Sequence, residues 1–571
     1  MLMTGAKILL ECLMEQKVDT IFGYPGGTIL NVYDELSFYE ADGRLRHILT
    51  AHEQGACHAA DGYARATGKV GVCFATSGPG ATNLVTGIAT AYLDSSPIVA
   101  ITCNVSRGLI GKDSFQEVDI TGVTMPITKC NFLVRSVDEL ADVVREAFAI
   151  ARSGRPGPVL IDIPKDVTAQ KAEYEKLPRR EHSSHGKLGD LMRRASHDFK
   201  APEPDMKDVS RLAQMIRESK KPMMICGGGV VRSRAHEEMA ALASRIDAPV
   251  AITVMGAGGF SGRSKLTTGM IGMHGSQASN RAVDECDLLI AVGCRFSDRV
   301  ALKPDSFARN ARIVQIDIDR SEINKNVRTD HHIIGDAKHV LSMLLDLIPE
   351  QLDHSEFKKF VFSFKTETEY DHAENRLTPS QVLGTVARVC PQDSIISTDV
   401  GQHQMWAIQH FHFDYPGQLL TSGGFGTMGF GLGAALGAKA AFPEKCVIHV
   451  TGDGGFRMNC NELATEQYYN LKVIHILFNN GTLGMVRQWQ NLIYQKRFTE
   501  TTLDRAPDFV KLADAYGLHG RRVTTQEELE TALNEALACD TGYIVDCAID
   551  IDEMVRPMVG GGSHITEFML N

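Results

Sequence analysis

The stretch that decides the fold is Cys446-Val447-Ile448-His449-Val450-Thr451-Gly452-Asp453-Gly454-Gly455, an apolar run that passes directly into a glycine-rich turn. A helical pattern from about residue 459 to 469 follows it, and a second apolar run, residues 473–478, ends in Asn479-Asn480. A strand, a helix and a second strand in this order predict parallel pairing through a helical crossover. Because parallel strands share one carboxyl edge, Asp453 and Asn480 are expected to lie close together there.

The residues at this edge are of the types that a cation and an anion require. A hard divalent cation takes oxygen ligands and leaves part of its shell to phosphate and water, so one carboxylate, one amide oxygen and a nearby carbonyl would suit it. Glycines let the backbone approach a phosphate, and the next helix offers its positive N-terminal end. A Gly-Asp-Gly alone favours the simpler interpretation of a tight turn, with Asn480-Gly481 as a second turn.

The two motifs together resemble, in order and spacing, the signature of enzymes that bind thiamine diphosphate. The resemblance implies that Mg2+ is held by Asp453, Asn480 and the backbone carbonyl of Thr482. It also implies contacts to the diphosphate from Gly452, Gly454 and Gly455.

The same alternation of short apolar runs and helical patterns occurs in three stretches of the chain. It predicts an α/β protein of three doubly wound parallel-sheet domains. The domains are predicted at residues 1–172, 207–350 and 378–571, joined by charged, weakly patterned linkers at 173–206 and 351–377. The predicted strands are 20–22, 48–49, 70–74, 98–102 and 159–163 in the first domain, 223–226, 250–253, 288–292 and 313–318 in the middle one, and 395–397, 447–450, 473–478 and 543–547 in the third.

Composition excludes several classes of function. Lys and Arg number 59 against 70 Asp and Glu, and neither sign is concentrated in a long run, so the chain has no electrostatic footprint for nucleic acid. The 13 cysteines form no CxxC pair and are typical of free thiols in a cytoplasmic protein. No apolar run is long enough to predict a membrane span.

Motifs outside the third domain extend the resemblance and name its family. Those of the first domain are similar, in order, to the pyrimidine-binding domain of acetohydroxyacid synthase (acetolactate synthase). They are Tyr24-Pro25-Gly26-Gly27, His52-Glu53-Gln54-Gly55, Thr76-Ser77-Gly78-Pro79-Gly80-Ala81-Thr82-Asn83, Phe115-Gln116-Glu117 and Ile163-Pro164-Lys165-Asp166-Val167. The similarity covers nearly the whole chain, continuing through Gly272-Met273-His274-Gly275, Arg295-Phe296-Ser297-Asp298-Arg299, Gly423-Gly424-Phe425-Gly426-Thr427-Met428-Gly429 and Gly484-Met485-Val486-Arg487-Gln488-Trp489-Gln490.

In that family a carboxylate hydrogen-bonds the pyrimidine ring of the cofactor, which lets the cofactor form the carbanion that the reaction needs. The resemblance gives this role to Glu53 and places Gly27, Gln116 and Lys165 at the reaction centre. By itself, Glu53 could equally be a charge favoured at a helix N-terminus. The other residues that the resemblance assigns to thiamine diphosphate are Pro79, Asn83, Gln402, His403, Gly426, Met428 and Met485.

The predicted middle domain has the marks of a nucleotide-binding fold. Cys226-Gly227-Gly228-Gly229 follows one apolar run, and Asp317 and Asp319 end another, as expected where phosphates and ribose meet a doubly wound sheet. A triple glycine is a weak signal alone, and a vestigial nucleotide fold is the alternative. Similarity to the flavin-containing synthases implies a structural, non-redox FAD held by Arg155, Gly228, Met273, His274, Gly275, Arg295, Asp317, Ile318 and Asp336.

The reaction that the resemblance implies joins two 2-oxo acids. Pyruvate is decarboxylated on thiamine diphosphate, and the hydroxyethyl unit passes to pyruvate or 2-oxobutyrate, the first common step of valine, leucine and isoleucine biosynthesis. The acceptor is an anion, and the family counterpart of Arg299 meets its carboxylate. Trp489 would form an apolar wall beside it, although the alternatives are an ordinary surface cation and an ordinary core aromatic.

The same scaffold leaves rival functions open, namely a flavin-dependent 2-oxo acid oxidase, a flavin-free catabolic acetolactate synthase and a catalytically silent regulatory homologue. The retention of Glu53, Asp453 and Asn480 disfavours the last of these. The resemblance further implies a homo-oligomer, a dimer at least, whose active sites lie at the interface between chains. Whether the oligomer is a dimer or a tetramer and whether there is a separate small regulatory subunit stay open.

Overall fold

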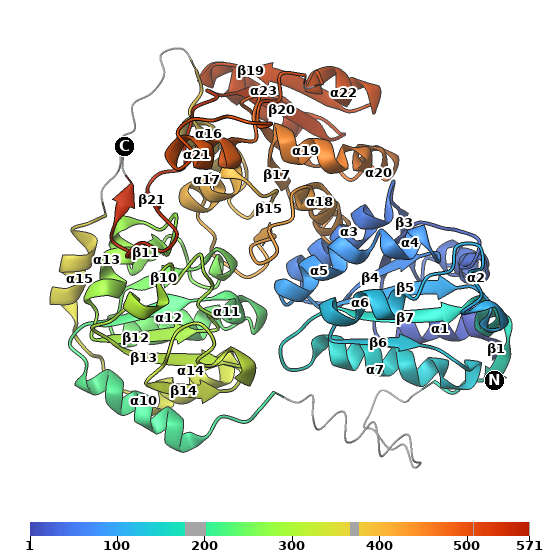
Figure 1. Cartoon of the computed structure of the whole chain (residues 1–571), viewed down its shortest axis with the longest axis horizontal. Helices are drawn as coiled ribbons and strands as arrows, with labels where there is room; N and C mark the ends of the chain where they lie inside the picture. Colours follow the sequence, from blue (N-terminus) through green and yellow to red (C-terminus); the bar gives the residue numbers. More distant parts are fainter. Residues whose placement is uncertain (177–200, 366–375, 506, 570–571) are drawn as a thin grey trace.

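Figure 1 shows the computed structural model, in which three lobes, each built on one sheet, surround a common centre. The structure describes residues 1–176, 201–365, 376–505 and 507–569. The first lobe is blue, the middle one green and the third orange to red. Each lobe contains one six-stranded sheet, and every strand pair within these three sheets is parallel. The prediction of three parallel-sheet α/β units is confirmed.

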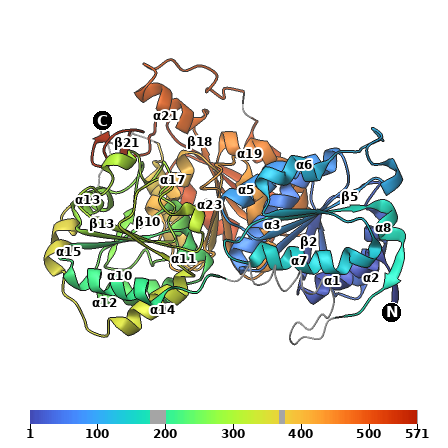
Figure 2. The ribbon, with the colours of Figure 1, turned by 60° about the horizontal axis from the view of Figure 1, so that its bottom comes forward.

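The first sheet has the order β3-β2-β4-β5-β7-β6. Its strands are β2 (Thr20–Gly23), β3 (Arg46–Leu49), β4 (Gly71–Ala75), β5 (Ile98–Asn104), β6 (Cys130–Leu133) and β7 (Val159–Pro164). One face carries α1 (Gly5–Glu15), α2 (Leu30–Ala41) and α7 (Leu140–Arg152), and the other carries α3 (Glu53–Thr67), α4 (Pro79–Thr82), α5 (Val85–Leu93) and α6 (Ile120–Thr124). Figure 2 shows α1, α2 and α7 on one side of this sheet and α3, α5 and α6 on the other.

The middle sheet has the order β11-β10-β9-β12-β13-β14. Its strands are β9 (Pro222–Cys226), β10 (Val250–Ile252), β11 (Thr267–Met270), β12 (Leu288–Val292), β13 (Arg312–Asp317) and β14 (His331–Ile334). One face carries α10 (Met206–Glu218), α12 (His236–Arg245) and α14 (Ala337–Leu347), and the other carries α13 (Gln277–Glu285) and α15 (Ser355–Phe362). The short α11 (Gly228–Arg232) follows β9 directly.

The third sheet has the order β16-β15-β17-β18-β20-β19. Its strands are β15 (Ile395–Thr398), β16 (Leu419–Thr421), β17 (Val447–Gly452), β18 (Ile474–Asn479), β19 (His519–Val523) and β20 (Tyr543–Ala548). The face toward the first lobe carries α18 (Phe430–Ala441), α19 (Asp453–Asn459), α20 (Leu463–Tyr468) and α22 (Phe509–Ala515). The other face carries α16 (Pro379–Val389), α17 (Gln402–His410) and α23 (Gln526–Ala538), and α21 (Gly484–Leu492) follows β18.

Strand order separates the middle sheet from the other two. Counted from its own first strand, the order is 2-1-3-4-6-5 in both the first and the third sheet, whereas the middle sheet has 3-2-1-4-5-6. The middle order is the one found in dinucleotide-binding folds, and ligands of doubly wound sheets bind where the order reverses. The reversal lies between β9 and β12 in the middle sheet and between β15 and β17 in the third.

The first and third lobes share one apolar core through α3 and α18. Glycines allow the two helices to approach closely: a Cβ at Gly62 would overlap the carbonyl oxygen of Ala434, and a Cβ at Gly437 would overlap that of Ala59. Such backbone contact holds α3, and therefore Glu53 at its start, against the third domain of the same chain.

Several expectations differ from the structure. The helical pattern predicted at about residues 459–469 corresponds to a 3-10 turn, Cys460–Glu462, and to α20, and an additional helix, α19, begins before it at Asp453. Part of the expected second linker is helical: α15 buries Phe357 and Val361 against the middle sheet. Residues 177–200 and 366–375 of the two expected linkers lie outside the described residues. Among the helices that the structure describes, none combines the length and apolarity that crossing a bilayer requires.

Candidate active site

The metal and diphosphate motif lies where the sequence places it, at the carboxyl ends of β17 and β18. The two strands pair in parallel, with Gly452 opposite Phe478. The Asp453 carboxylate is buried and accepts hydrogen bonds from the backbone N–H groups of Gly454 and Gly481, each at 2.9 Å. Burial raises the pKa of Asp453 to about 6, a penalty on the charged form that a bound cation would offset.

Asn480 and Thr482 sit on the turn after β18. The amide oxygen of Asn480 accepts from the backbone N–H of Thr482 at 3.2 Å, and the Thr482 hydroxyl donates to the carbonyl of Thr501 at 2.7 Å. Gly481 has a φ of 66° and no atom within 4 Å of its Cβ position, so this turn leaves open space beside Asp453. The three predicted ligands therefore lie together.

A buried histidine faces the same edge from α17. In the part of the chain that the structure describes, nothing hydrogen-bonds Nε2 of His403, although the side chain is buried. Burial lowers the pKa of His403 to about 4, so the ring is neutral. A Cβ at Gly452 would lie 3.0 Å from Nδ1 of His403, so a larger residue there would have to displace the ring slightly. A buried ring nitrogen without a partner suits a polar group of a ligand, and the glycine turn that leads into a helix N-terminus suits a phosphate.

Gln402 has a different environment from its neighbour His403. Its amide nitrogen donates to Gln488 Oε1 at 2.9 Å and to the carbonyl of Glu553 at 2.7 Å. It therefore joins α17 to α21 and to the chain after β20. Beneath these residues, Asp399 accepts from the Thr451 hydroxyl at 2.6 Å and from the N–H of Gly431 at 2.7 Å.

The first-domain residues form a second cluster. Glu53 begins α3, is buried, and accepts a hydrogen bond from the amide of Asn83 at 2.9 Å. Pro79 begins α4, the helix that ends just before Asn83. Lys165 Nζ donates to the carbonyl of Gly27 at 2.9 Å.

Gln116 belongs to the same side of the first domain. It lies in the loop after β5 with a φ of 59°, and a Cβ at Gly78 would lie 2.8 Å from its carbonyl oxygen. Gly78 itself has a φ of 59° and caps α4, so the loop and the glycine turn are fitted to each other.

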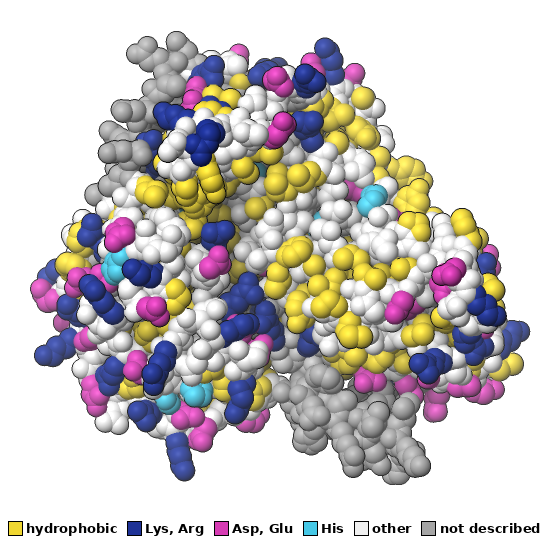
Figure 3. Space-filling view, in the orientation of Figure 1, with side chains coloured by type: hydrophobic (Ala, Val, Ile, Leu, Met, Phe, Trp, Pro, Cys, Tyr) yellow, Lys and Arg dark blue, Asp and Glu magenta, His cyan; other side chains and the backbone are white. Residues whose placement is uncertain are grey.

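A cavity of about 770 Å³ lies at the junction of the three domains. Figure 3 shows the hollow between the lobes, with Lys and Arg side chains gathered at it. Gly426 and Met428 line this cavity from the loop before α18, and Gly426 has a φ of 74° with no atom within 4 Å of its Cβ position. The predicted acceptor-site residues Arg299 and Trp489 line it as well, and so does Met485, which the resemblance assigns to thiamine diphosphate.

Arg299 keeps its charge available in this cavity. Its side chain is 63% exposed, its nearest carboxylate is Asp298 at 3.9 Å, and Nη1 lies 3.6 Å from the sulfur of Met273. Trp489 packs against an apolar cluster made of Met273, Leu302, Met558 and Val559. A cation beside an apolar wall is suited to a short carboxylate with an alkyl chain.

The flavin candidates surround the same cavity on the middle-domain side. Eight of the nine line it, and Gly275 instead packs against Asn280 and Gly272. Gly229 and Gly293 are in close backbone contact, since a Cβ at Gly229 would lie 2.5 Å from the Cα of Gly293. They follow β9 and β12, the two strands between which the strand order reverses. Nδ1 of His274 is buried without a hydrogen-bond partner among the described residues, and burial lowers the pKa of this ring to about 4.

Three of the flavin candidates are already engaged within the chain. Arg155 is paired with Glu322 at 2.7 Å and Asp319 at 3.3 Å. Asp336 caps α14. Asp317 accepts a hydrogen bond from the backbone N–H of Asp319 at 3.0 Å, and burial raises its pKa to about 6. The glycine turn, the strand order and an open histidine nitrogen fit a dinucleotide.

The central cavity is lined by neither of the two clusters described above. Among the described residues that line it, neither Glu53, Gly27 and Gln116 nor the three predicted metal ligands occur. This cavity therefore brings together the acceptor and flavin candidates, and not the carboxylate of Glu53 or the predicted diphosphate anchor.

Comparison with known proteins shows which protein families the three domains match. A family model described as the N-terminal TPP binding domain of thiamine pyrophosphate enzymes matches residues 3–123, the model of the central domain matches 209–344, and that of the C-terminal TPP binding domain matches 399–547. The probable acetolactate synthase large subunit of Methanocaldococcus jannaschii is 46% identical over 99% of this chain and 95% of that protein. The acetolactate synthase isozyme 2 large subunit of Escherichia coli is 43% identical over 99% of both chains.

The chain belongs to the acetolactate synthase family of thiamine pyrophosphate enzymes. Another member, the acetolactate synthase large subunit of Cyanidium caldarium, is 44% identical over 99% of this chain and 96% of that protein. Family membership makes the chain a thiamine diphosphate-dependent enzyme, as the sequence motifs predict.

Two residues near the candidate site, Asp399 and Glu462, are not predicted from the sequence. Asp399 follows β15, so the rule that ligands gather at carboxyl ends of strands could have found it. Glu462 is fully buried and accepts from the N–H of Ala51 at 3.1 Å, which fixes the approach to Glu53. No sequence pattern marks Glu462, because its partner lies 411 residues away.

Proposed function

We propose that this enzyme decarboxylates pyruvate on thiamine diphosphate and transfers the two-carbon unit to pyruvate or 2-oxobutyrate. This is the first common step in the biosynthesis of valine, leucine and isoleucine. One observation carries the proposal: a buried carboxylate, Asp453, and an unsatisfied buried nitrogen, His403 Nε2, face the edge where the third sheet reverses its strand order. That combination suits a metal-bound diphosphate.

Mg2+ is the cation that this site would hold. Asp453, the amide oxygen of Asn480 and the carbonyl of Thr482 supply three oxygen ligands, and a hard cation would complete its shell with phosphate and water. His403, Gly452 and Gly454 would contact the diphosphate. The long apolar side chain of Met428, whose Cε lies 3.8 Å from the Cβ position of Gly454, would support the organic part of the cofactor.

When bound, thiamine diphosphate supplies a nucleophilic ring carbon that adds to a 2-oxo acid. Glu53 would hold a proton against the pyrimidine nitrogen, oriented by its hydrogen bond from Asn83. Arg299 would bind the acceptor carboxylate, and Trp489 would exclude water from its alkyl end. An apolar, water-poor pocket favours loss of carbon dioxide, because it disfavours the separated charge of the carboxylate.

FAD would occupy the middle-domain side of the central cavity, since Arg155, Arg295 and Asp336 line it and the sheet has the dinucleotide order. The reaction involves no net redox change, so its role would be structural. The flavin would fill the space between the second sheet and the loop that carries Gly426 and Met428.

The active unit would be a homodimer or a larger homo-oligomer. Glu53, Gly27 and Gln116 do not line the cavity that holds Gly426 and Arg299, so a second copy of the chain would bring its own first domain to that cavity. The two relatives are named large subunits, and a large subunit implies a small one. These names support a separate small regulatory subunit for this enzyme. Cytoplasmic location is proposed because all 13 cysteines are free.

The test is the formation of acetolactate from pyruvate by the purified protein with thiamine diphosphate and Mg2+, with and without added FAD. We expect product only when both thiamine diphosphate and Mg2+ are present, and more of it with FAD. Oxygen consumption with pyruvate and no acetolactate would instead identify a flavin-dependent oxidase. Competition between pyruvate and 2-oxobutyrate would rank the acceptors.

A further inference from the structure

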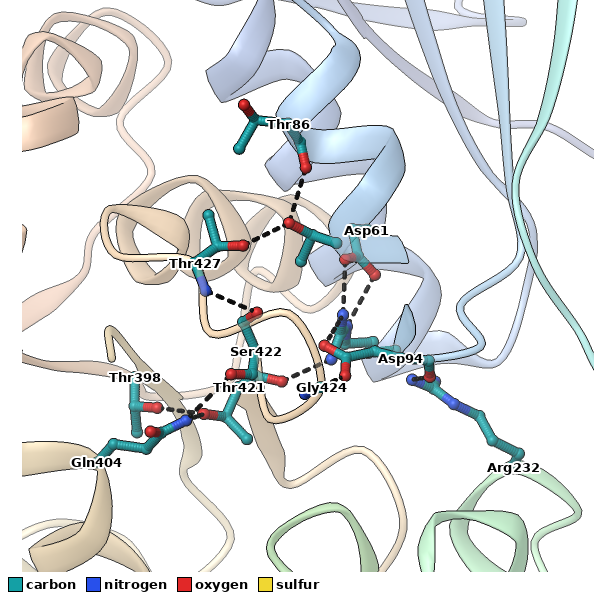
Figure 4. A network of polar contacts seen from close by, with 12 residues as sticks. Asp61, Thr86, Asp94, Arg232, Thr398, Gln404, Thr421, Ser422, Gly424 and Thr427 are labelled. Carbon is teal, nitrogen blue, oxygen red and sulfur yellow. Dashed lines mark hydrogen bonds and ion pairs between the residues drawn. The ribbon is translucent and has the colours of Figure 1, made fainter. Parts of the chain in front are cut away.

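A buried network of charged and hydroxyl side chains joins the first domain to a loop of the third (Figure 4). The loop, residues 421–429, runs from the end of β16 to the start of α18 and carries Gly426 and Met428. The network is centred on Arg65 of α3, which binds Asp61 through Nε and Nη2, both at 2.7 Å, and Asp94 through Nη2 at 3.0 Å. All three side chains are almost completely buried.

Arg65, Asp94 and Thr90 of the first domain form three hydrogen bonds with the loop. Arg65 Nη1 donates to the carbonyl of Thr421 at 2.6 Å, and the N–H of Gly424 donates to Asp94 Oδ1 at 2.7 Å. Further along, the hydroxyls of Thr90 and Thr427 lie 2.6 Å apart. We call Arg65, Asp61, Asp94 and Thr90 the clamp. Its three contacts lie on both sides of Gly426, the residue whose open face borders the cavity.

The third domain by itself holds the two ends of this loop. Thr421 is bonded to Thr398 at 2.6 Å and to Gln404 at 2.7 Å, and the carbonyl of Gly429 accepts from Asn459 at 2.7 Å. Between these ends, the bond within the loop that the described residues show is from Thr427 N–H to Ser422 Oγ at 3.0 Å. Two glycines in the left-handed region, Gly426 and Gly429, add backbone freedom. The clamp therefore supplies most of what fixes the centre of the loop.

Stability alone is a poor explanation for such a cluster. Burying an ion pair costs desolvation that its attraction roughly repays, and apolar residues of similar volume often hold two surfaces as well. Arg232 of the middle domain joins the cluster by donating to the carbonyl of Asp94 at 3.1 Å, so two cations face two carboxylates. Although burial disfavours the charged form, attraction to Arg65 holds the pKa of Asp61 below its usual value. What such a cluster provides beyond an apolar contact is fixed geometry.

We propose that Arg65, Asp61, Asp94 and Thr90 are positioning residues. They hold Gly426 and Met428 in the position in which these two residues would contact thiamine diphosphate. The inference rests on the proposed function. It has a consequence for the oligomer: because the proposed site takes Glu53 from a second copy of the chain, each chain's own first domain sets the loop that this second copy meets.

The test compares two variants that each remove one buried carboxylate from an arginine. Asp94→Asn weakens the pair with Arg65 and disturbs the bond from Gly424. Glu15→Gln is the matched control: Glu15 is paired with Arg145 at 3.0 Å between α1 and α7, on the far face of the first sheet, and both side chains are largely buried. Thermal unfolding, flavin content and the affinity for thiamine diphosphate with Mg2+, measured by titration calorimetry, are recorded for each.

We expect Asp94→Asn to weaken cofactor binding about tenfold, equivalent to about 1.4 kcal/mol. Glu15→Gln should lower the melting temperature comparably and leave cofactor affinity within about twofold of the parent, because it does not touch the loop. Equal cofactor affinity in the two variants overturns the proposal. Loss of flavin from Asp94→Asn with unchanged thiamine diphosphate affinity also overturns it and assigns the network to the flavin cavity instead.

If Asp94→Asn does not fold, Thr427→Val decides, because it removes the bond to Thr90 without leaving a buried charge unpaired. A loss of cofactor affinity in Thr427→Val that the added change Thr90→Val does not deepen supports the clamp, and unchanged affinity overturns it. Failure of the parent protein to bind thiamine diphosphate at all would refute the proposed function, which keeps the two outcomes distinct.

Discussion

The substitution Glu53→Gln tests the chemistry with little disturbance of the fold. The side chain keeps its shape, and the glutamine oxygen can still accept the hydrogen bond that Asn83 donates to the carboxylate at 2.9 Å. What disappears is the ability to hold and exchange a proton. A positioned acid or base contributes typically 10²–10⁴-fold to a rate, which corresponds to about 3–5 kcal/mol of transition-state stabilisation.

The cost to stability should be small by comparison. Glu53 is the first residue of α3, where a negative charge is worth about 0.3–1 kcal/mol through the helix dipole. The predicted metal ligands lie in the third domain, at the start of α19 and on the turn after β18, so binding of Mg2+ and thiamine diphosphate should persist. We therefore expect a variant that melts within a few degrees of the parent, binds the cofactor, and forms acetolactate at least 100-fold more slowly.

The assay measures acetolactate over time at saturating cofactor, with calorimetric titration of thiamine diphosphate and thermal unfolding on the same preparation. Glu35→Gln is the control, since Glu35 lies on α2 of the same domain and pairs only with Lys7 at 3.5 Å among the ion pairs of the described residues. Turnover of Glu53→Gln within about fivefold of the control, with the cofactor bound, would show that this carboxylate does not activate the cofactor.

Three further predictions concern other parts of the molecule. Arg299→Ala should reduce use of the acceptor about tenfold or more while sparing pyruvate decarboxylation, measured as carbon dioxide release, and equal loss of both would contradict its role. Burial raises the pKa of Asp162 to about 6, so the folded state binds its proton more tightly than the unfolded state, and the free energy of unfolding should fall as pH rises from about 4 to about 6. Asp162→Asn should remove that loss, with a gain of up to about 3 kcal/mol at pH 8 and little at pH 4 in urea titrations, and an equal gain at both pH values would disprove the cause. Gly62→Ala should destabilise the chain by roughly 1–3 kcal/mol because its Cβ would overlap Ala434, whereas Gly384→Ala, with open space around it in a helix, should stabilise by about 0.5–1 kcal/mol, and melting curves compare the two.

The central strands of each sheet follow from sequence, and the edge strands do not. β9 and β12 are buried on both faces and appear as uninterrupted apolar runs. Five of the six edge strands, β6, β11, β14, β16 and β19, were not predicted. An edge strand is paired on one side only and tolerates polar residues, as in the His519–Val523 segment, so its pattern merges with that of a loop.

The site divides in a similar way. Asp453 and Asn480 were predictable because both follow strands that pair in parallel, and a short crossover fixes their separation. Glu53 was assigned through family motifs rather than through its surroundings, since the residues that bury and orient it, Asn83 and Glu462, lie far along the chain. Local pattern records the period of a strand or helix, but it does not record which distant side chain will face a given carboxylate.

The amino-acid sequence is enough to predict the parallel sheets, the glycine turns at their carboxyl ends and the candidate metal ligands. These depend on hydrophobic period and short-range turn geometry, which a few neighbouring residues encode. The packing of the domains was needed to see that the middle sheet has a different strand order, that neither the Glu53 nor the Asp453 cluster lines the central cavity, and that Arg65 reaches the loop of residues 421–429. Those facts depend on contacts between residues hundreds of positions apart, which form only when the three domains pack together.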